Sequence, residues 1–199
     1  MTTEMLIIAA ARIAGSLPVL RWPLAGAIVA MVVDLSDLFM MNLIHLGGVK
    51  GYQSFDKWLD QVYMLTFLAV ALRWHGAPQK IALALYAYRM LGFVAFEVTD
   101  DRDVLLFFPN VFEFWFVFVA GIKQFGLEGP APSAASRVPG SRLLVPFRYS
   151  WGQVMSISAL LLAAKLLQEY AIHVGRWFDG FTAVEAMEAI WEFLISPLR

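Results

Sequence analysis

The feature that most constrains this chain is a series of long apolar segments that contain few charges. Of its 199 residues, 60 % are hydrophobic and only 16 % are charged, whereas soluble domains carry about a quarter charged residues. Apolar segments of this length are typical of helices that cross a bilayer. The sequence therefore predicts an all-α fold: a polytopic membrane helix bundle of five or six transmembrane helices plus an interfacial C-terminal helix. We expect one transmembrane domain over residues 1–199.

Six segments are candidates for these spans. The first, residues 4–20, is interrupted by Arg12 and Pro18, so it either crosses the membrane or lies at its surface. The other candidate segments are residues 24–45, 56–74, 81–98, 104–122 and 151–175. Residues 123–150 are rich in Gly, Pro, Ser and Arg, which favours a mobile loop. Residues 181–195 carry acids on one face and apolar residues on another, which indicates an interfacial or partner-docking helix.

Composition excludes several classes of function. A net charge of −1 gives no electrostatic footprint for nucleic acid, so no nucleic-acid partner is expected. The absence of cysteine excludes disulfides, thiolate metal sites and Cys nucleophiles. The histidines, His45, His75 and His173, show no metal-ligand spacing, and haem is not expected. The N-terminus lacks a basic region and an A-x-A cleavage site, so we expect no cleavable signal peptide. The predicted location is the bacterial inner membrane or an equivalent.

Two pairs of aspartates flank the short segment that joins two apolar helices. Asp34 and Asp37 are three residues apart, and Asp56 and Asp60 are four apart, so each pair shares one helical face. Carboxylates at membrane depth are costly unless they are paired, hydrated or bound to a metal. Hard divalent cations take oxygen ligands of this kind, often together with substrate phosphates. These four aspartates therefore predict a site for Mg²⁺ or Mn²⁺.

Simpler interpretations of both pairs stay open. Asp56 and Asp60 would also suit a wet loop and the first turn of a helix, where acids interact favourably with the helix dipole. Asp34 and Asp37 would also be stable if an intramembrane arginine neutralised them.

Further charges lie near the middles of the predicted spans. Buried charges persist by pairing, so a structural ion-pair network is one interpretation, with Lys165 and Glu169 satisfying each other at i,i+4. Arg89 is suited to a phosphate as well as to a carboxylate. We expect Arg89 to face the bundle interior, within salt-bridge reach of Glu113 or of the first aspartate pair.

The spacing of the four aspartates, D-x2-D-x18-D-x3-D, resembles the signature of the CDP-alcohol phosphatidyltransferases, D-x2-D-G-x2-A-R-x8-9-G-x3-D-x3-D. Arg12 followed by Pro18 is similar to an early Arg-then-Pro stretch of that family, and Arg89 falls where its members often have Arg. Leu38 replaces the Gly of the signature, and Met41 with Asn42 replaces its Ala-Arg. The resemblance covers roughly residues 5–95.

This resemblance implies a membrane enzyme with six transmembrane helices that transfers a phosphoalcohol group to a lipid or alcohol acceptor. It implies that Asp34, Asp37 and Asp56 hold the divalent metal and that Asp60 is a further ligand or the general base. Arg89 would hold a phosphate, so Asp60 and Arg89 are the expected catalytic residues. The partners would be membrane lipids and, through the C-terminal helix, a second copy or a larger complex.

Two other functions stay open from the sequence. One is a non-catalytic transmembrane subunit of a larger membrane complex that binds partners, lipid or pigment. The other is an ion or proton transporter that uses the charges at membrane depth.

Overall fold

The computed structural model describes residues 2–35, 52–129 and 147–170. Over these residues the regular structure is helical apart from one isolated β-bridge between Glu128 and Phe147, so the all-α prediction is confirmed there. The elements are α1 (Thr3–Ser16), η1 (Leu17–Leu20), α2 (Pro23–Leu35), α4 (Tyr52–Ala71), α5 (Ala77–Thr99), η2 (Arg102–Phe107), α6 (Val111–Gln124) and α7 (Trp151–Glu169). The predicted helix at 181–195, the end of the predicted helix 24–45 and most of the predicted loop 123–150 lie outside the described residues.

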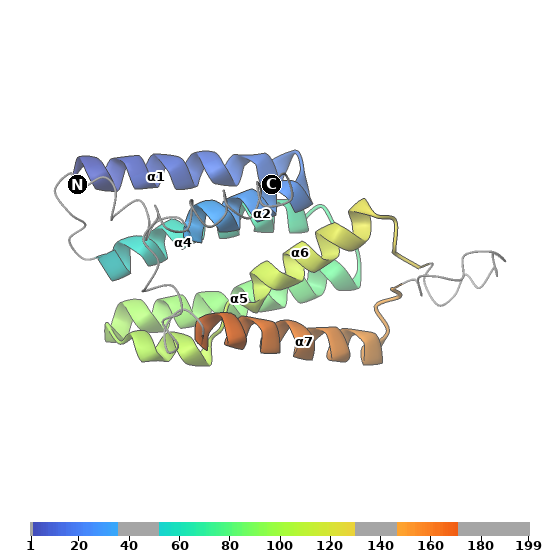
Figure 1. Ribbon diagram of the computed structural model, residues 1–199. Helices are drawn as coiled ribbons and strands as arrows, with labels where there is room; N and C mark the ends of the chain where they lie inside the picture. The colour runs from blue at the N-terminus through green and yellow to red at the C-terminus, as the bar shows by residue number, and fades with distance from the viewer. Residues whose placement is uncertain (1, 36–51, 130–146, 171–199) are drawn as a thin grey trace, which may run out of the picture.

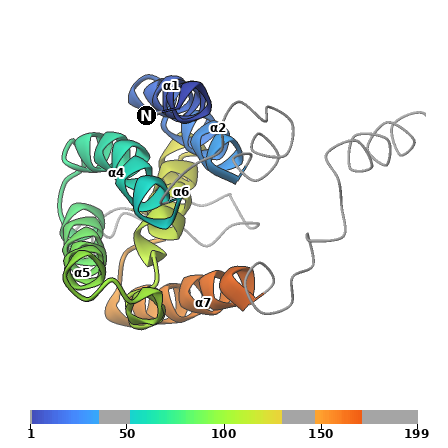
Figure 2. The ribbon, with the colours of Figure 1, turned by 90° about the vertical axis from the view of Figure 1, so that its left-hand side faces the viewer.

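Helix α6 lies at the centre of the bundle, with the other helices arranged around it (Figures 1 and 2). It packs against α2, α4, α5 and α7. Its side chains Phe112, Trp115 and Phe116 are fully buried. Phe116 stacks on Phe67 of α4, with ring centroids 4.3 Å apart, and on Trp74, 5.1 Å away. The aromatic segment is therefore the packed core of the bundle.

The predicted helix over 104–122 is wrong, because the chain breaks between η2 and α6. Pro109 lies in this break. Proline has no N–H to donate, and it disfavours helical backbone at the residue before it. The break leaves the carbonyl of Phe108 without a helical partner and turns the side chain of Asn110 into the interior, where it is 4 % exposed.

Two glycines permit close backbone approaches around these elements. A Cβ on Gly26 would lie 2.3 Å from the backbone nitrogen of Val19, so only glycine lets α2 pack directly against η1. A Cβ on Gly92 would lie 2.3 Å from the Cβ of Phe108, so glycine brings α5 against the break before α6.

Two described segments are long and apolar enough to cross a membrane, Thr3–Leu20 and Ala77–Thr99. A shorter apolar helix covers Pro23–Asp34. Helix α6 has only 14 residues because Pro109 shortens it, and α4 carries three charges in its first half. The number of spans, five or six, stays a prediction.

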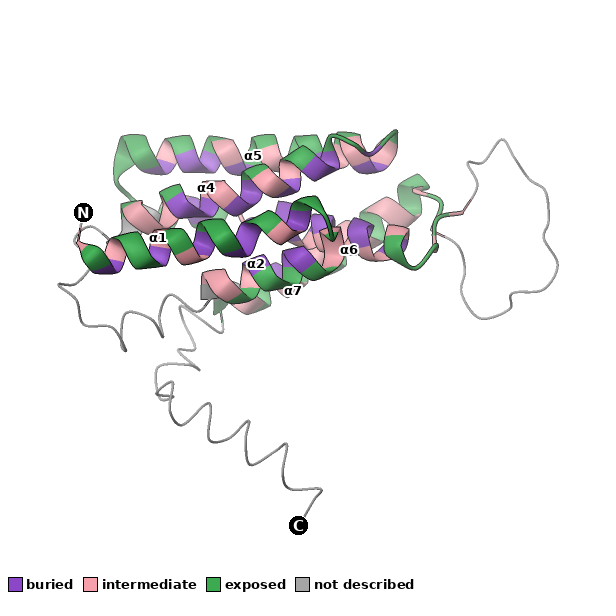
Figure 3. Cartoon of the chain, turned by 90° about the horizontal axis from the view of Figure 1, so that it is seen from above, coloured by how far each residue is buried: buried purple, intermediate pink, exposed green. Residues whose placement is uncertain are grey.

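The outer surface of the helices is largely apolar, and the interior holds charges. Exposed residues run along the outer sides of α1 and α5 (Figure 3). The most exposed large apolar side chains are Val98, Trp151, Phe107, Phe125, Trp22, Leu91, Leu160 and Val32. The buried polar and charged side chains are Glu4, Arg12, Ser16, Asp60, Arg89, Asn110, Glu113 and Lys165. Buried charges together with many exposed large apolar side chains are unusual in a water-soluble domain.

Candidate functional site

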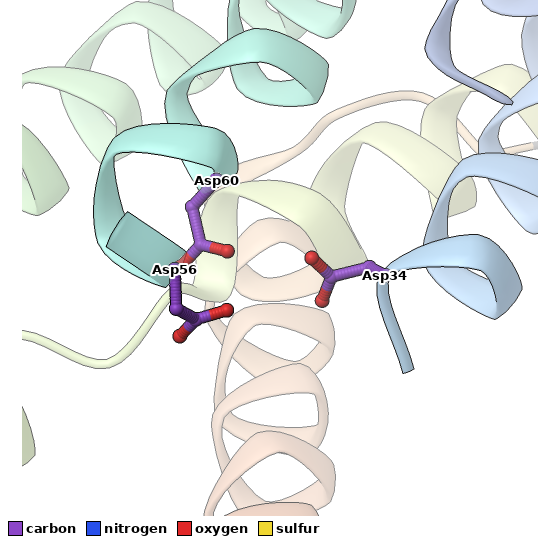
Figure 4. Close-up of side chains that lie close together, drawn as sticks. All are labelled: Asp34, Asp56 and Asp60. Carbon is purple, nitrogen blue, oxygen red and sulfur yellow. The ribbon is translucent and has the colours of Figure 1, made fainter. Parts of the chain in front are cut away.

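Three of the four predicted carboxylates meet at one point. Asp34 reaches it from α2, and Asp56 and Asp60 reach it from α4 on the opposite side (Figure 4). One carboxylate oxygen from each residue lies within 4.8 Å of the others. Asp37 lies outside the described residues. We call Asp34, Asp56 and Asp60 the carboxylate triad.

The ends of two helices bring the triad together. Asp34 lies near the end of the described part of α2. Helix α4 begins at Tyr52, four residues before the predicted start, so Asp56 and Asp60 lie on successive turns inside it. Asp60 is only 6 % exposed. The alternative of a wet loop and a first turn is therefore wrong, and these acids need cationic partners or a metal.

Arg12 of α1 contacts all three carboxylates of the triad. Its guanidinium donates to Oδ1 of Asp56 at 3.1 Å and to Oδ1 of Asp60 at 2.9 Å. It also forms an ion pair with Oδ1 of Asp34. Arg12 is buried. A buried arginine therefore pairs with Asp34, as the alternative for the first aspartate pair expected, and its place relative to a membrane stays a prediction.

Lys57 contacts the second oxygen atom of two of these carboxylates, those of Asp56 and Asp60. Its Nζ lies 2.7 Å from Oδ2 of Asp56 and 3.1 Å from Oδ2 of Asp60. The two cations therefore divide the triad by atom, because Arg12 contacts the Oδ1 atoms and Lys57 contacts the Oδ2 atoms. Within the described residues, Arg12 and Lys57 are the cations that contact these carboxylates. Three carboxylates also form a donor set of the kind that suits a hard divalent cation.

Arg89 of α5 faces the interior as predicted, but its predicted salt bridge is wrong within the described residues. Its Nη1 donates to the carbonyl of Phe108 at 2.8 Å, the group that the break at Pro109 releases. Its Nε is buried and has no hydrogen-bond partner among the residues that the structure describes. The positive charge of Arg89 acts on Asp60 and on Tyr63 of the neighbouring helix. Arg89 therefore lies beside the triad with part of its hydrogen-bonding capacity unused.

A second buried polar cluster surrounds Glu113 of α6. Its carboxylate accepts from Tyr63 at 2.9 Å, from Asn110 at 3.1 Å and from Lys165 at 2.7 Å. Lys165 of α7 also donates to Gln168 at 3.0 Å. The ammonium of Lys165 thus pairs across the bundle, while the side chain of Glu169, its predicted partner, lies outside the described residues. We call Tyr63, Asn110, Glu113 and Lys165 the Glu113 cluster.

Sequence reasoning missed Lys57, Tyr63 and Asn110. A signal existed for the first two, because Lys57 and Tyr63 lie three residues before and after Asp60 and so share its helical face. Asn110 follows a proline directly, and that proline marks a break in which a polar side chain replaces backbone partners.

None of the protein-family models, curated proteins or solved structures compared with the chain matches it. The resemblance to the CDP-alcohol phosphatidyltransferases therefore rests on the aspartate spacing and the residues around it.

Proposed function

We propose that this protein is an integral membrane enzyme that uses a divalent cation, Mg²⁺ or Mn²⁺, to transfer a phosphoalcohol group to a lipid or alcohol acceptor. The observation that carries this proposal is the carboxylate triad, in which oxygens from two helices lie within 4.8 Å of one another. Acids that converge in an apolar bundle need positive charge beside them, which Arg12 and Lys57 supply in the structure and which a divalent cation could supply in the place of Arg12.

The large apolar side chains on the outside of the helices support a place in the membrane. Large apolar side chains such as Val98, 79 % exposed, and Leu91, 63 % exposed, cover the outside of α5, while Arg89 of the same helix is buried. Soluble monomers rarely expose contiguous apolar patches of more than a few hundred Å². In a bilayer the same surface contacts acyl chains, and the buried charges mark the functional interior.

The chain's own residues have distinct roles in this proposal. Asp34 and Asp56 bind the cation, together with Asp37 as the aspartate spacing implies. A bound divalent cation would neutralise phosphate charge and orient the donor. Asp60, the most buried of the triad, is a further ligand or the base that accepts the proton of the acceptor hydroxyl. Arg89 offers its Nε, which has no hydrogen-bond partner among the described residues, to a phosphate oxygen, for which a guanidinium is well suited.

The test is a turnover assay on the purified protein in lipid vesicles. CDP-diacylglycerol and other CDP-alcohols are supplied as donors with a mixture of polyol and phosphorylated-alcohol acceptors, and release of CMP is measured with and without Mg²⁺ or Mn²⁺. We expect metal-dependent CMP release, with a loss of about 100-fold or more in Asp60→Asn if Asp60 is the base. Lys123→Gln, a charge change remote from the triad, is the control and should retain wild-type turnover. No metal-dependent release from any of these donors would contradict the proposal.

One observation favours a second candidate, a non-catalytic transmembrane subunit. Arg12 and Lys57 already neutralise most of the triad's charge, so these acids can be explained as a structural ion-pair network that joins α1, α2 and α4. On this interpretation Mg²⁺ and Mn²⁺ leave the melting temperature of the protein unchanged.

A further inference from the structure

Arg12 and Lys57, the two described cations that contact the carboxylate triad, occupy different positions. The Oδ1 atoms of Asp34, Asp56 and Asp60 are all turned to one guanidinium, that of Arg12. Lys57 touches only Oδ2 atoms, and only those of the two acids on its own helix. Arg12 thus lies between the helices, at the point where the three carboxylates converge, and Lys57 lies at the edge.

We propose that Arg12 is an internal counter-cation of the triad, which occupies the position of the divalent cation and must withdraw for the ion to bind. This inference rests on the proposed function, because it concerns the same cation. It assigns Arg12 a role in setting metal affinity, as a positioning residue.

Geometry makes the two cations exclusive. Divalent cations of this kind bind oxygens at about 2–2.6 Å, and the nitrogens of Arg12 lie 2.9 and 3.1 Å from the Oδ1 atoms of Asp60 and Asp56. An ion that contacts the same three Oδ1 atoms would lie within a few Å of the guanidinium. Like charges at that separation repel strongly in a buried site, and the two species need the same lone pairs. Binding is therefore an exchange.

Arg12 would also stabilise the folded bundle before a metal ion binds. Arg12 belongs to α1, Asp34 to α2, and Asp56 with Asp60 to α4, so one side chain links three helices. Without it, the bundle would bury three carboxylates with Lys57 as their single described partner, which is costly.

The test is titration of Mn²⁺ into the purified full-length protein by isothermal calorimetry, at fixed pH and ionic strength. The variants are Arg12→Gln, Lys57→Gln and Lys123→Gln, which each remove one positive charge. We expect Arg12→Gln to bind Mn²⁺ about 10- to 100-fold more tightly than wild type, the factor that corresponds to a lost hydrogen bond to a charged group. Lys57→Gln should gain less, because it frees only Oδ2 atoms, and Lys123→Gln should match wild type.

The outcomes separate this inference from the proposed function. If wild type binds Mn²⁺ and Arg12→Gln binds it no more tightly, the exchange is refuted and the proposed function stands. If only Arg12→Gln binds, the competition is real and the metal-dependent function of the natural protein is refuted. If neither binds at millimolar Mn²⁺, both are refuted.

Arg12→Lys covers the case in which Arg12→Gln does not fold. A lysine keeps the charge but lacks the planar fork that contacts two carboxylates at once. We expect its Mn²⁺ affinity to lie between those of wild type and Arg12→Gln, and an affinity equal to that of wild type would overturn the inference. Adding Mn²⁺ during purification should also rescue folded Arg12→Gln, since the ion takes the place of the missing cation.

Discussion

The ion pair between Lys165 and Glu113 should hold α7 on the bundle, and its loss should cost far more than the loss of a surface pair of the same length. Both side chains are buried, and the Nζ–Oε1 distance is 2.7 Å. Lys165→Met keeps most of the side-chain volume but leaves the Glu113 carboxylate, among the residues that the structure describes, with the neutral donors Tyr63 and Asn110 alone. Removing one partner of a buried pair costs about 3–5 kcal/mol of the free energy of unfolding.

The chain supplies a matched control. Lys123 and Glu128 also lie 2.7 Å apart, but their side chains are 31 % and 36 % exposed. Because solvent screens such a pair, Lys123→Met should cost at most about 1 kcal/mol. The measurement is equilibrium unfolding in detergent, followed by circular dichroism, with wild type and both variants under identical conditions.

A double variant isolates the pair itself. Glu113→Gln in the Lys165→Met background removes the uncompensated charge, so the double variant should be more stable than Lys165→Met alone. The contacts would be misinterpreted if the free energies of unfolding of Lys165→Met and Lys123→Met differed by less than about 1 kcal/mol. The same would follow if adding Glu113→Gln to Lys165→Met lowered the free energy of unfolding further.

Three more predictions follow from single contacts. Gly92→Ala should destabilise by about 1–3 kcal/mol in a thermal melt, because its Cβ would lie 2.3 Å from the nearest side-chain atom, whereas Gly152→Ala, with nothing within 4 Å, should be neutral or stabilising. Tyr63→Phe should cost about 1–3 kcal/mol by chemical denaturation, since it removes the hydroxyl from two buried hydrogen bonds. Burial, and then a hydrogen bond to the Glu128 carboxylate, raises the pKa of Tyr149 above its ordinary value. The neutral phenol is therefore favoured in the folded state, so its contribution is complete below pH ~10 and is lost as pH rises further; Tyr149→Phe should remove this part of the alkaline destabilisation.

The elements could be predicted from the sequence largely because apolar runs and turn residues mark them. Helices α5 and α7 begin within four residues of the predicted starts. The main error, the helix over 104–122, came from giving the apolar run more weight than Pro109. The run is apolar because α6 is the core of the bundle, and apolarity alone does not separate a central helix from a span.

Part of the candidate site could be predicted from the spacing of residues along a helix. Spacing along a helix places Asp56 beside Asp60, and it would also have placed Lys57 and Tyr63 on their face. The ion pairs of Arg12 with the triad could not be predicted, because Arg12 belongs to another helix and contacts the triad only through tertiary packing. Similarly, Arg89 binds a backbone carbonyl that only the break at Pro109 makes available.

The most direct measurement is an anomalous-scattering map from crystals of the protein grown with Mn²⁺. A metal-dependent enzyme should show one peak about 2–2.6 Å from oxygens of Asp34, Asp56 and Asp60, with the guanidinium of Arg12 withdrawn from the Oδ1 atoms. A map without a peak at the triad, in which Arg12 still bridges all three carboxylates, would contradict the metal site and leave the triad as a structural ion-pair network.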